Sequence, residues 1–201
     1  MSLTISLSPN EVQELLARIG IQCHYTSEEE ATFKTTPVVE RSERVFGFPS
    51  PADNSKLTIR NIKSCVGTDP RFQPCFFEHP WYANEDFMQL RCKPGWHFLL
   101  MDILPGSLQR PVDYANSWID SDLMLPTAVE VILMLFLHYL GSGEQLLLRK
   151  HTWCSDTASL NRQVTVGAFG RNGVFLSGHP PGFASRGLGI CGKVTGLGFD
   201  S

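Results

Sequence analysis

The sequence predicts an α+β fold formed by a single domain over residues 1–201, with an N-terminal helix and a central buried helix packed on a C-terminal antiparallel β-meander. Three observations predict it. A chain of 201 residues can bury one sizeable core. A long apolar run with helix start and stop signals lies at 127–140, and strand-like segments separated by turn residues follow it. A subdivision into a proline-punctuated part, 1–110, and a part with the helix and the meander, 111–201, stays open.

The first predicted element is a helix that begins after Ser8. Ser8 is a good N-cap, Pro9 suits the first helical position, and Glu11 completes a capping box. Apolar residues then recur at helical spacing at Val12, Leu15, Leu16 and Ile19. We expect the helix to end near Gly20.

The middle of the chain carries weaker signals. Residues 22–51 contain many acidic and turn residues and predict an irregular connection. The imperfect alternation in 56–66 favours a strand over a helix. Six prolines lie between residues 70 and 111, which excludes long helices there. Between them, the apolar run from Trp96 to Leu104 predicts a buried strand, in which Asp102 needs a partner if it is buried.

The central helix is predicted over 127–140. Thr127 and Glu130 form a second capping box, the following residues are apolar except for Glu130 and His138, and Gly141 supplies a stop. The run is shorter than the roughly 20 residues that span a bilayer. It therefore predicts a core helix and no membrane partner.

Three strands are predicted after this helix, at 145–154, 162–169 and 173–177. Asn172-Gly173 favours a tight hairpin between the last two. Together they predict the antiparallel meander.

Composition limits the function classes. The net charge is −3, from 17 basic and 20 acidic residues, and no basic run exceeds two residues, so nucleic acid is not an expected partner. The N-terminus lacks the pattern of a secretory signal. The six cysteines are widely spaced, which favours reduced thiols and a soluble protein of the cytoplasm.

The stretch RGLGICGKVTG, residues 186–196, has the G-x-G-x-x-G spacing of a nucleotide-phosphate loop. A dinucleotide site needs a helix that opens on the glycines and an acidic residue about 20 positions later, yet only nine residues follow Gly192. We interpret the string as a glycine-rich turn or irregular edge strand, in which positive φ explains the clustering.

A mixed pattern of cysteines and histidines offers an alternative interpretation, a zinc site. The residues Cys75, His79, Cys92 and His97 form C-x3-H-x12-C-x4-H, and thiolate and imidazole are ligands that zinc prefers. Familiar zinc sites keep like ligands in each pair, whereas both pairs here are mixed. The favoured interpretation is therefore independent core cysteines and hydrogen-bonded histidines, without a cofactor.

Other catalytic patterns are weak. No serine-hydrolase, zinc-protease or cysteine-protease signature is present. Cys154, His151 and Asp156 are close in sequence, but neighbouring positions do not make a triad, and the end of a strand with a turn-forming Asp156 explains them. The Asp120-x-Asp122 pair resembles a cation-binding motif, for which solvated loop carboxylates are the simpler explanation.

Aromatic residues offer a binding hypothesis. Trp81, Tyr82, Trp96 and His97 cluster in the proline-rich stretch, where rings with a polar tip often line ligand or partner surfaces, although a core also needs such rings. We expect a non-catalytic binding or interaction protein whose partner is a protein or a small molecule. The alternative is a zinc-dependent or Cys/His hydrolase, with zinc at the four Cys and His residues named above.

Overall fold

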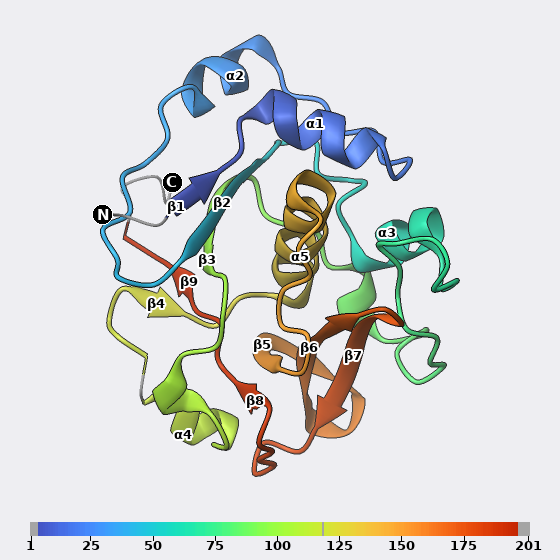
Figure 1. Cartoon of the computed structure of the whole chain (residues 1–201), viewed down its shortest axis with the longest axis vertical. Coiled ribbons are helices and arrows are strands. Elements are labelled where there is room, and N and C mark those ends of the chain that lie inside the picture. The colour runs from blue at the N-terminus through green and yellow to red at the C-terminus, as the bar shows by residue number, and fades with distance from the viewer. Residues whose placement is uncertain (1–3, 118, 197–201) are drawn as a thin grey trace.

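The computed structural model describes residues 4–117 and 119–196, which form two β-sheets with a helix between them (Figure 1). The helices are α1 (Pro9–Ala17), α2 (Ser27–Phe33), α3 (Ile59–Val66), α4 (Val112–Asn116) and α5 (Ala128–Ser142). The strands are β1 (Thr4–Ser6), β2 (Val45–Ser50), β3 (Gly95–Leu100), β4 (Leu123–Met124), β5 (His151–Ala158), β6 (Arg162–Gly170), β7 (Gly173–His179), β8 (Leu188–Gly189) and β9 (Lys193–Val194). Short 3-10 turns occupy Asp86–Gln89, Pro105–Ser107 and Ser159–Asn161. The predicted α+β fold class is confirmed.

The two sheets are both mixed. The first has the order β1-β2-β3-β9-β4, with β1 parallel to β2 and the other neighbours antiparallel. The second has the order β7-β6-β5-β8, in which β5, β6 and β7 form the predicted antiparallel meander and β8 joins parallel to β5. Because β8 belongs to one sheet and β9 to the other, residues 188–194 connect the sheets directly.

The central helix α5 is confirmed. Thr127 caps it through the predicted capping box with Glu130, and every residue from Ala128 to His138 is buried. The predicted stop at Gly141 is wrong: the helix continues to Ser142, and Gly143 takes the left-handed conformation that ends it. No helix in the described part of the chain combines the length and the apolar character that a bilayer span requires.

One hydrophobic cluster fills the space around α5 and extends from Val12 to Val194, so it draws on residues from both sides of position 110. Helix α1 is confirmed with its capping box at Ser8, and it buries Val12 and Leu16 in this cluster. The first half of the chain is thus held to the second by apolar packing.

Two predictions for the middle of the chain are wrong. Residues 22–51 are not an irregular connection, because Thr26 and Glu29 form a third capping box that starts α2, and β2 follows as a fully buried strand. Residues 56–66 contain the helix α3 rather than a strand. Thr58 caps α3, and Ile59 and Ile62 share its buried face.

The predicted strands exist with shifted limits. Strand β3 ends at Leu100 rather than Leu104, and β5 begins at His151 rather than at residue 145, because Leu147 has a positive φ that interrupts an extended strand. The β6–β7 hairpin pairs Gly170 with Gly173, so residues 171–172 form its turn instead of the predicted Asn172-Gly173 pair.

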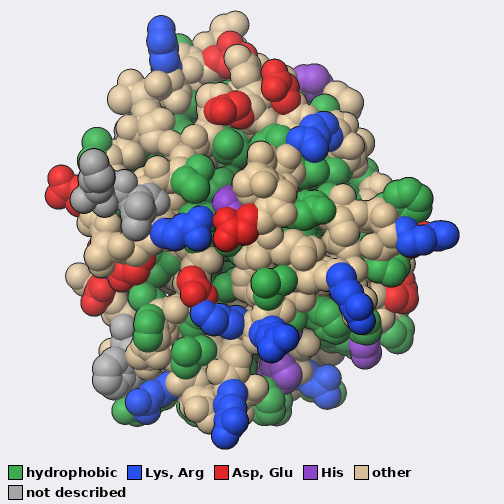
Figure 2. Space-filling view, viewed as in Figure 1, with side chains coloured by type: hydrophobic (Ala, Val, Ile, Leu, Met, Phe, Trp, Pro, Cys, Tyr) green, Lys and Arg blue, Asp and Glu red, His purple; other side chains and the backbone are tan. Residues whose placement is uncertain are grey.

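Charged side chains of both signs are interspersed on the face shown in Figure 2. Asp102 is exposed and pairs with Lys150, whose Nζ lies 2.7 Å from its carboxylate. Arg44 pairs with Glu144, which also lies 3.1 Å from Nε2 of the buried His138. The Lys150–Asp102 and Arg44–Glu144 pairs are exposed to water, and exposed ion pairs contribute little to the free energy of unfolding.

Candidate functional site

A buried carboxylate is the centre of the candidate site. Glu130 lies in the first turn of α5, where its Oε2 accepts a hydrogen bond from the backbone N–H of Thr127 at 2.8 Å. Its other oxygen, Oε1, lies 2.7 Å from Lys193 Nζ and 3.0 Å from His97 Nδ1. The side chain is 3% exposed. One carboxylate therefore caps the helix and binds two basic groups.

His97 is held between two acceptors. It lies on β3 opposite Phe48 of β2, and the two rings stack with centroids 5.1 Å apart. Its Nε2 lies 2.8 Å from the carbonyl oxygen of Lys93 and 3.5 Å from Cys92 Sγ. The Nδ1 contact with Glu130 is an ion pair at an angle unsuited to a linear hydrogen bond.

These contacts determine the protonation state of His97. A carbonyl oxygen only accepts, so the contact with Lys93 requires a proton on Nε2. The carboxylate of Glu130, 3.0 Å from Nδ1, favours the positively charged form of the ring. Burial alone would lower the pKa of His97, but Cys92 and Glu130 outweigh it and raise the pKa to about 10. His97 is therefore an imidazolium at neutral pH.

Lys193 completes the buried network. It lies on β9, where it is paired with Leu99 of β3 on one side and Met124 of β4 on the other. Burial by itself would raise the pKa of Glu130, but His97 and Lys193 together hold it well below its usual range. Two buried or nearly buried cations thus share a single carboxylate.

A small cavity of about 120 Å³ opens beside this network, and we name it the Trp96 cavity. It is lined by Lys93, Pro94, Gly95, Trp96, His97, Met124, Lys193, Val194, Thr195 and Gly196. The indole Nε1 of Trp96 is buried and has no hydrogen-bond partner in the described residues. The wall of the cavity therefore presents the basic residues Lys93, His97 and Lys193.

The four aromatic positions predicted to face a ligand separate into two groups. Trp96 and His97 lie together at the Trp96 cavity. Tyr82 is fully buried and its hydroxyl donates to the carbonyl of Phe77, which places the ring in the core and corrects its predicted exposure. Trp81 is partly buried, and its Nε1 donates to the carbonyl of Leu176.

The four-ligand zinc arrangement is not formed. Within residues 4–117 and 119–196, no group of three or more His, Cys, Asp or Glu side chains could hold a metal ion. Cys92 and His97 are neighbours, but Cys75 is buried where its carbonyl accepts from Val174, and His79 is exposed with Nδ1 accepting from Trp81. The spacing places only one of the two predicted pairs in contact.

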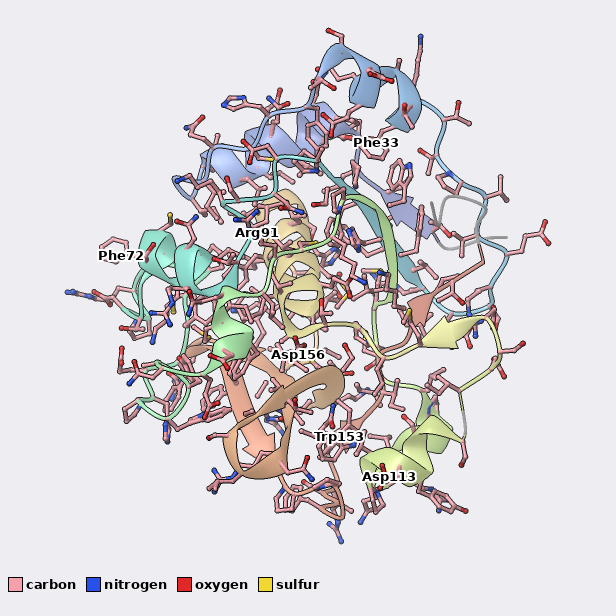
Figure 3. The ribbon with its side chains drawn as sticks, turned by 180° about the vertical axis from the view of Figure 1, so that it is seen from behind. Phe33, Phe72, Arg91, Asp113, Trp153 and Asp156 are labelled. Carbon is pink, nitrogen blue, oxygen red and sulfur yellow. The ribbon has the colours of Figure 1, made fainter. Side chains whose placement is uncertain are left out.

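The other carboxylate patterns have structural partners. Asp156 is not a turn residue but part of β5, and it accepts a hydrogen bond from the first backbone N–H of α5, beside which it lies in Figure 3. Burial lowers the pKa of His151 to about 4 and raises that of the Cys154 thiol, whose Sγ donates to the carbonyl of Thr152. Within the described chain, Cys154, His151 and Asp156 are therefore not joined by hydrogen bonds into a catalytic triad.

The Asp120-x-Asp122 pair is also engaged. Arg41 Nη2 lies 3.2 Å from Asp120, and Arg41 Nη1 lies 2.6 Å from Asp122. Both carboxylates therefore balance an arginine that is itself 8% exposed.

The glycine string crosses from one sheet to the other. A Cβ on Gly189 would lie 2.4 Å from Ile103 Cγ2, and one on Gly187 would lie 2.6 Å from the carbonyl oxygen of Arg149. Neither these two glycines nor Gly192 has a positive φ, so the predicted reason is wrong for them, whereas Gly196 at the end of the string has a φ of 73° as predicted. Close approach of neighbouring chain requires the first three glycines. No helix follows within residues 193–196. Residues 197–201, the last five of the nine that follow Gly192, lie outside the described chain.

Raising the pH from 7 to 8.5 is expected to lower the free energy of unfolding. The folded pKa of His97 near 10 lies above its ordinary value of 6.5, so in this window the folded chain keeps a proton that the unfolded chain has released. Stability present below pH 6.5 is thus lost as the pH rises, on the order of 1 kcal/mol per pH unit.

Urea denaturation at several pH values measures this slope, with His97→Gln as the comparison. The groups facing His97 are Cys92 and Glu130, with Lys193 reached through Glu130. The window stops at pH 8.5, where unfolded thiols are about half ionised, and their contribution is common to the two proteins. Equal slopes in the two proteins would contradict the assignment to His97.

No protein-family model, curated protein or solved structure matches the chain. The residues of the site are therefore the guide to its function.

Proposed function

We propose that this chain is a non-catalytic binding protein that takes up a small molecule in the Trp96 cavity. The observation that carries the proposal is a cavity of about 120 Å³ whose lining includes Lys93, His97 and Lys193, the last two held in place by their shared contact with Glu130. Small-molecule sites typically combine a concave wall with a few fixed polar groups. A small polar ligand that enters the cavity would meet these groups.

The fixed position of His97 supports the proposal of a small-molecule site. His97 is oriented by three contacts, to Phe48, Lys93 and Glu130, and it lies on a strand in the interior of its sheet. Small-molecule sites typically place a few fixed polar groups on a preformed concave wall. The six cysteines are all free and five are buried, which supports the cytoplasmic location included in this proposal.

A cysteine hydrolase is the second candidate, and a specific geometry favours it. Cys92 Sγ, His97 Nε2, His97 Nδ1 and Glu130 Oε1 follow one another with separations of 3.5 Å between the first two and 3.0 Å between the last two. This is the order of nucleophile, base and orienting carboxylate. Against it, Cys92 is 0% exposed and Nε2 is held closer to the Lys93 carbonyl, so substrate has no path to the sulfur in this conformation.

The test of the binding proposal is a screen of small polar compounds monitored through the indole ¹⁵N–H resonance of Trp96. We expect at least one compound to shift this resonance saturably in the wild-type protein. Met124→Trp should abolish the shift, because Met124 lines the cavity and is 47% exposed, so a larger ring there closes the entrance. Leu90→Trp is the matched control, since Leu90 is 50% exposed and lies away from the cavity lining.

Two results would overturn the proposal. One is a screen with no saturable shift, or with a shift that survives Met124→Trp. The other is turnover of activated esters that is lost in Cys92→Ser and retained in Cys65→Ser, whose sulfur is exposed; this would favour the cysteine hydrolase.

A further inference from the structure

A second hollow lies at the edge of the first sheet, and we name it the Ile5 groove. It has a volume of about 290 Å³ and lies between β1, α1 and the C-terminal end of α5. Figure 1 shows α1 lying across one end of α5. The walls of the groove include Ile5, Leu15, Phe46 and Leu137 and the side chains of Glu11 and Glu14. The groove shares no lining residue with the Trp96 cavity.

The floor of the groove is apolar. Phe46 and Leu137 are each 1% exposed, whereas Ile5, on the edge strand β1, is 41% exposed. Leu15 is partly buried and packs against the main hydrophobic cluster. An apolar ligand in the groove would cover Ile5 and the exposed part of Leu15, and the hydrophobic effect favours such a contact.

Two carboxylates stand on one wall of the groove. Glu11 and Glu14 lie three positions apart on the same face of α1, so their negative charges repel each other. The backbone N–H and the hydroxyl of Ser8 donate to Glu11 at 2.7 Å each, and these bonds hold the pKa of Glu11 below its ordinary value. In the described chain, neither carboxylate forms an ion pair with a Lys or Arg side chain.

The charged groups around the groove leave it negative. Arg18, outside the lining, donates to the carbonyl of Leu140 at 2.6 Å and offsets one of the two carboxylates. Glu144 is balanced by Arg44 and lies 3.1 Å from Nε2 of His138, so the sum is −1 while His138 is neutral. The last turn of α5 contains no basic residue, and a helix C-terminus carries a partial negative charge of its own. Acidic side chains gather at the end of the molecule where α1 and α2 lie (Figure 2).

We infer that the Ile5 groove binds a small primary amine carried on an apolar body, with Glu11 and Glu14 as the partners of its ammonium group. A volume of about 290 Å³ corresponds to roughly ten water molecules in the liquid, which admits one aromatic ring with a short aminoalkyl arm. The ring covers Ile5 and Leu15, and the ammonium group relieves the repulsion between the two carboxylates. This site goes beyond the proposed function and does not depend on it.

The experiment titrates the protein with benzylamine at pH 7 and low ionic strength, with the δ1 methyl resonance of Ile5 as the readout. Benzyl alcohol has the same ring without the charge, and methylammonium has the charge without the ring. We expect a saturable shift with benzylamine. Binding of benzyl alcohol should be about tenfold weaker, as the loss of two exposed ion pairs implies, and binding of methylammonium should be weaker by at least that factor.

A matched pair of variants assigns the charge. Glu14→Gln is expected to weaken benzylamine binding about threefold, because an exposed ion pair contributes little. Glu28→Gln removes the same charge from an exposed helical glutamate outside the groove and should leave binding unchanged. Since both side chains are exposed, both variants should fold.

A further variant fills the groove. Gly141 lines it in the last turn of α5, and a Cβ added there would lie 3.7 Å from Leu15 Cδ1, which is an ordinary contact. Gly141→Leu therefore brings apolar atoms into the groove without a clash, and leucine favours the helix more than glycine does. We expect this variant to lose the benzylamine shift, whereas Gly141→Ala, which adds a single carbon, should keep it.

Four results would overturn the inference. They are the lack of a saturable shift with benzylamine, a control compound that binds as tightly as benzylamine, equal effects of the two glutamate variants, and a shift that survives Gly141→Leu. Each of them concerns the Ile5 groove alone. The proposal for the Trp96 cavity is tested through a different resonance and stands or fails separately.

Discussion

Glu130→Gln is expected to lower the free energy of unfolding by about 3–5 kcal/mol, because it leaves two cations without their shared carboxylate. Glutamine keeps the length of the side chain and can still accept the hydrogen bond from Thr127, so the helix cap is largely preserved. The loss therefore measures the charge at Oε1, where His97 and Lys193 meet. His97 should respond by losing its proton at a lower pH than in the wild-type protein.

Urea denaturation at pH 7 measures the loss, and Glu144→Gln is the matched control. Glu144 also contacts a histidine and a basic side chain, His138 and Arg44, but its side chain is 51% exposed. Exposed pairs contribute at most about 1 kcal/mol. Similar losses in the two variants would show that the buried network is not a distinct source of stability.

The sequence predicted one part of this network and could not predict the rest. The capping box at Thr127 and Glu130 is local, since its residues are three positions apart, and the sequence predicts it correctly. The contact between Glu130 and Lys193 joins residues 63 positions apart. His97 is predicted as a ligand-facing residue and, together with Cys92, as a zinc ligand in the alternative interpretation, and neither prediction includes the contact with Glu130 or with Lys193.

Helix α3 and strand β2 differ from their predictions for similar physical reasons. In α3, Leu57 and Ile59 suggested alternation, but Ile59, Ile62 and Val66 follow helical spacing once Thr58 is recognised as a cap. In β2, Pro49 belongs to a stretch, 48–55, that predicts a turn, and Gly47 is not a typical strand residue. Gly47 is required because the Phe98 ring lies where its Cβ would be, and Pro49 lies past the end of β1, where its missing N–H removes no bond to that strand. Both reasons lie in neighbouring strands.

The central helix was predictable because its signal depends on no distant partner. A continuous apolar run with a capping box at its start specifies a helix that is buried all round, and α5 is such a helix. The sequence could not specify which rings meet there. Phe136 contacts Phe76, with ring centroids 5.4 Å apart, and Phe169 of β6 at 5.5 Å, so it joins the helix to a segment before it and a strand after it.

Phe136→Ala is therefore expected to cost about 3–5 kcal/mol of unfolding free energy, the range for removing a fully buried ring from a core. Phe136 is 1% exposed, and its neighbours belong to the second sheet and to a loop packed on it, so they are unable to close the space without moving the sheet. Leu148→Ala is the control: Leu148 is 58% exposed, and its truncation should change stability by less than about 0.5 kcal/mol. Urea denaturation of the two variants measures both losses, which are compared through the midpoints provided that the free energy of unfolding falls with urea concentration at the same slope in both. A loss at Phe136 no larger than at Leu148 would mean that α5 does not carry the packing between the sheets in solution, and Glu130 in its first turn would then lack a rigid support for its contacts with His97 and Lys193.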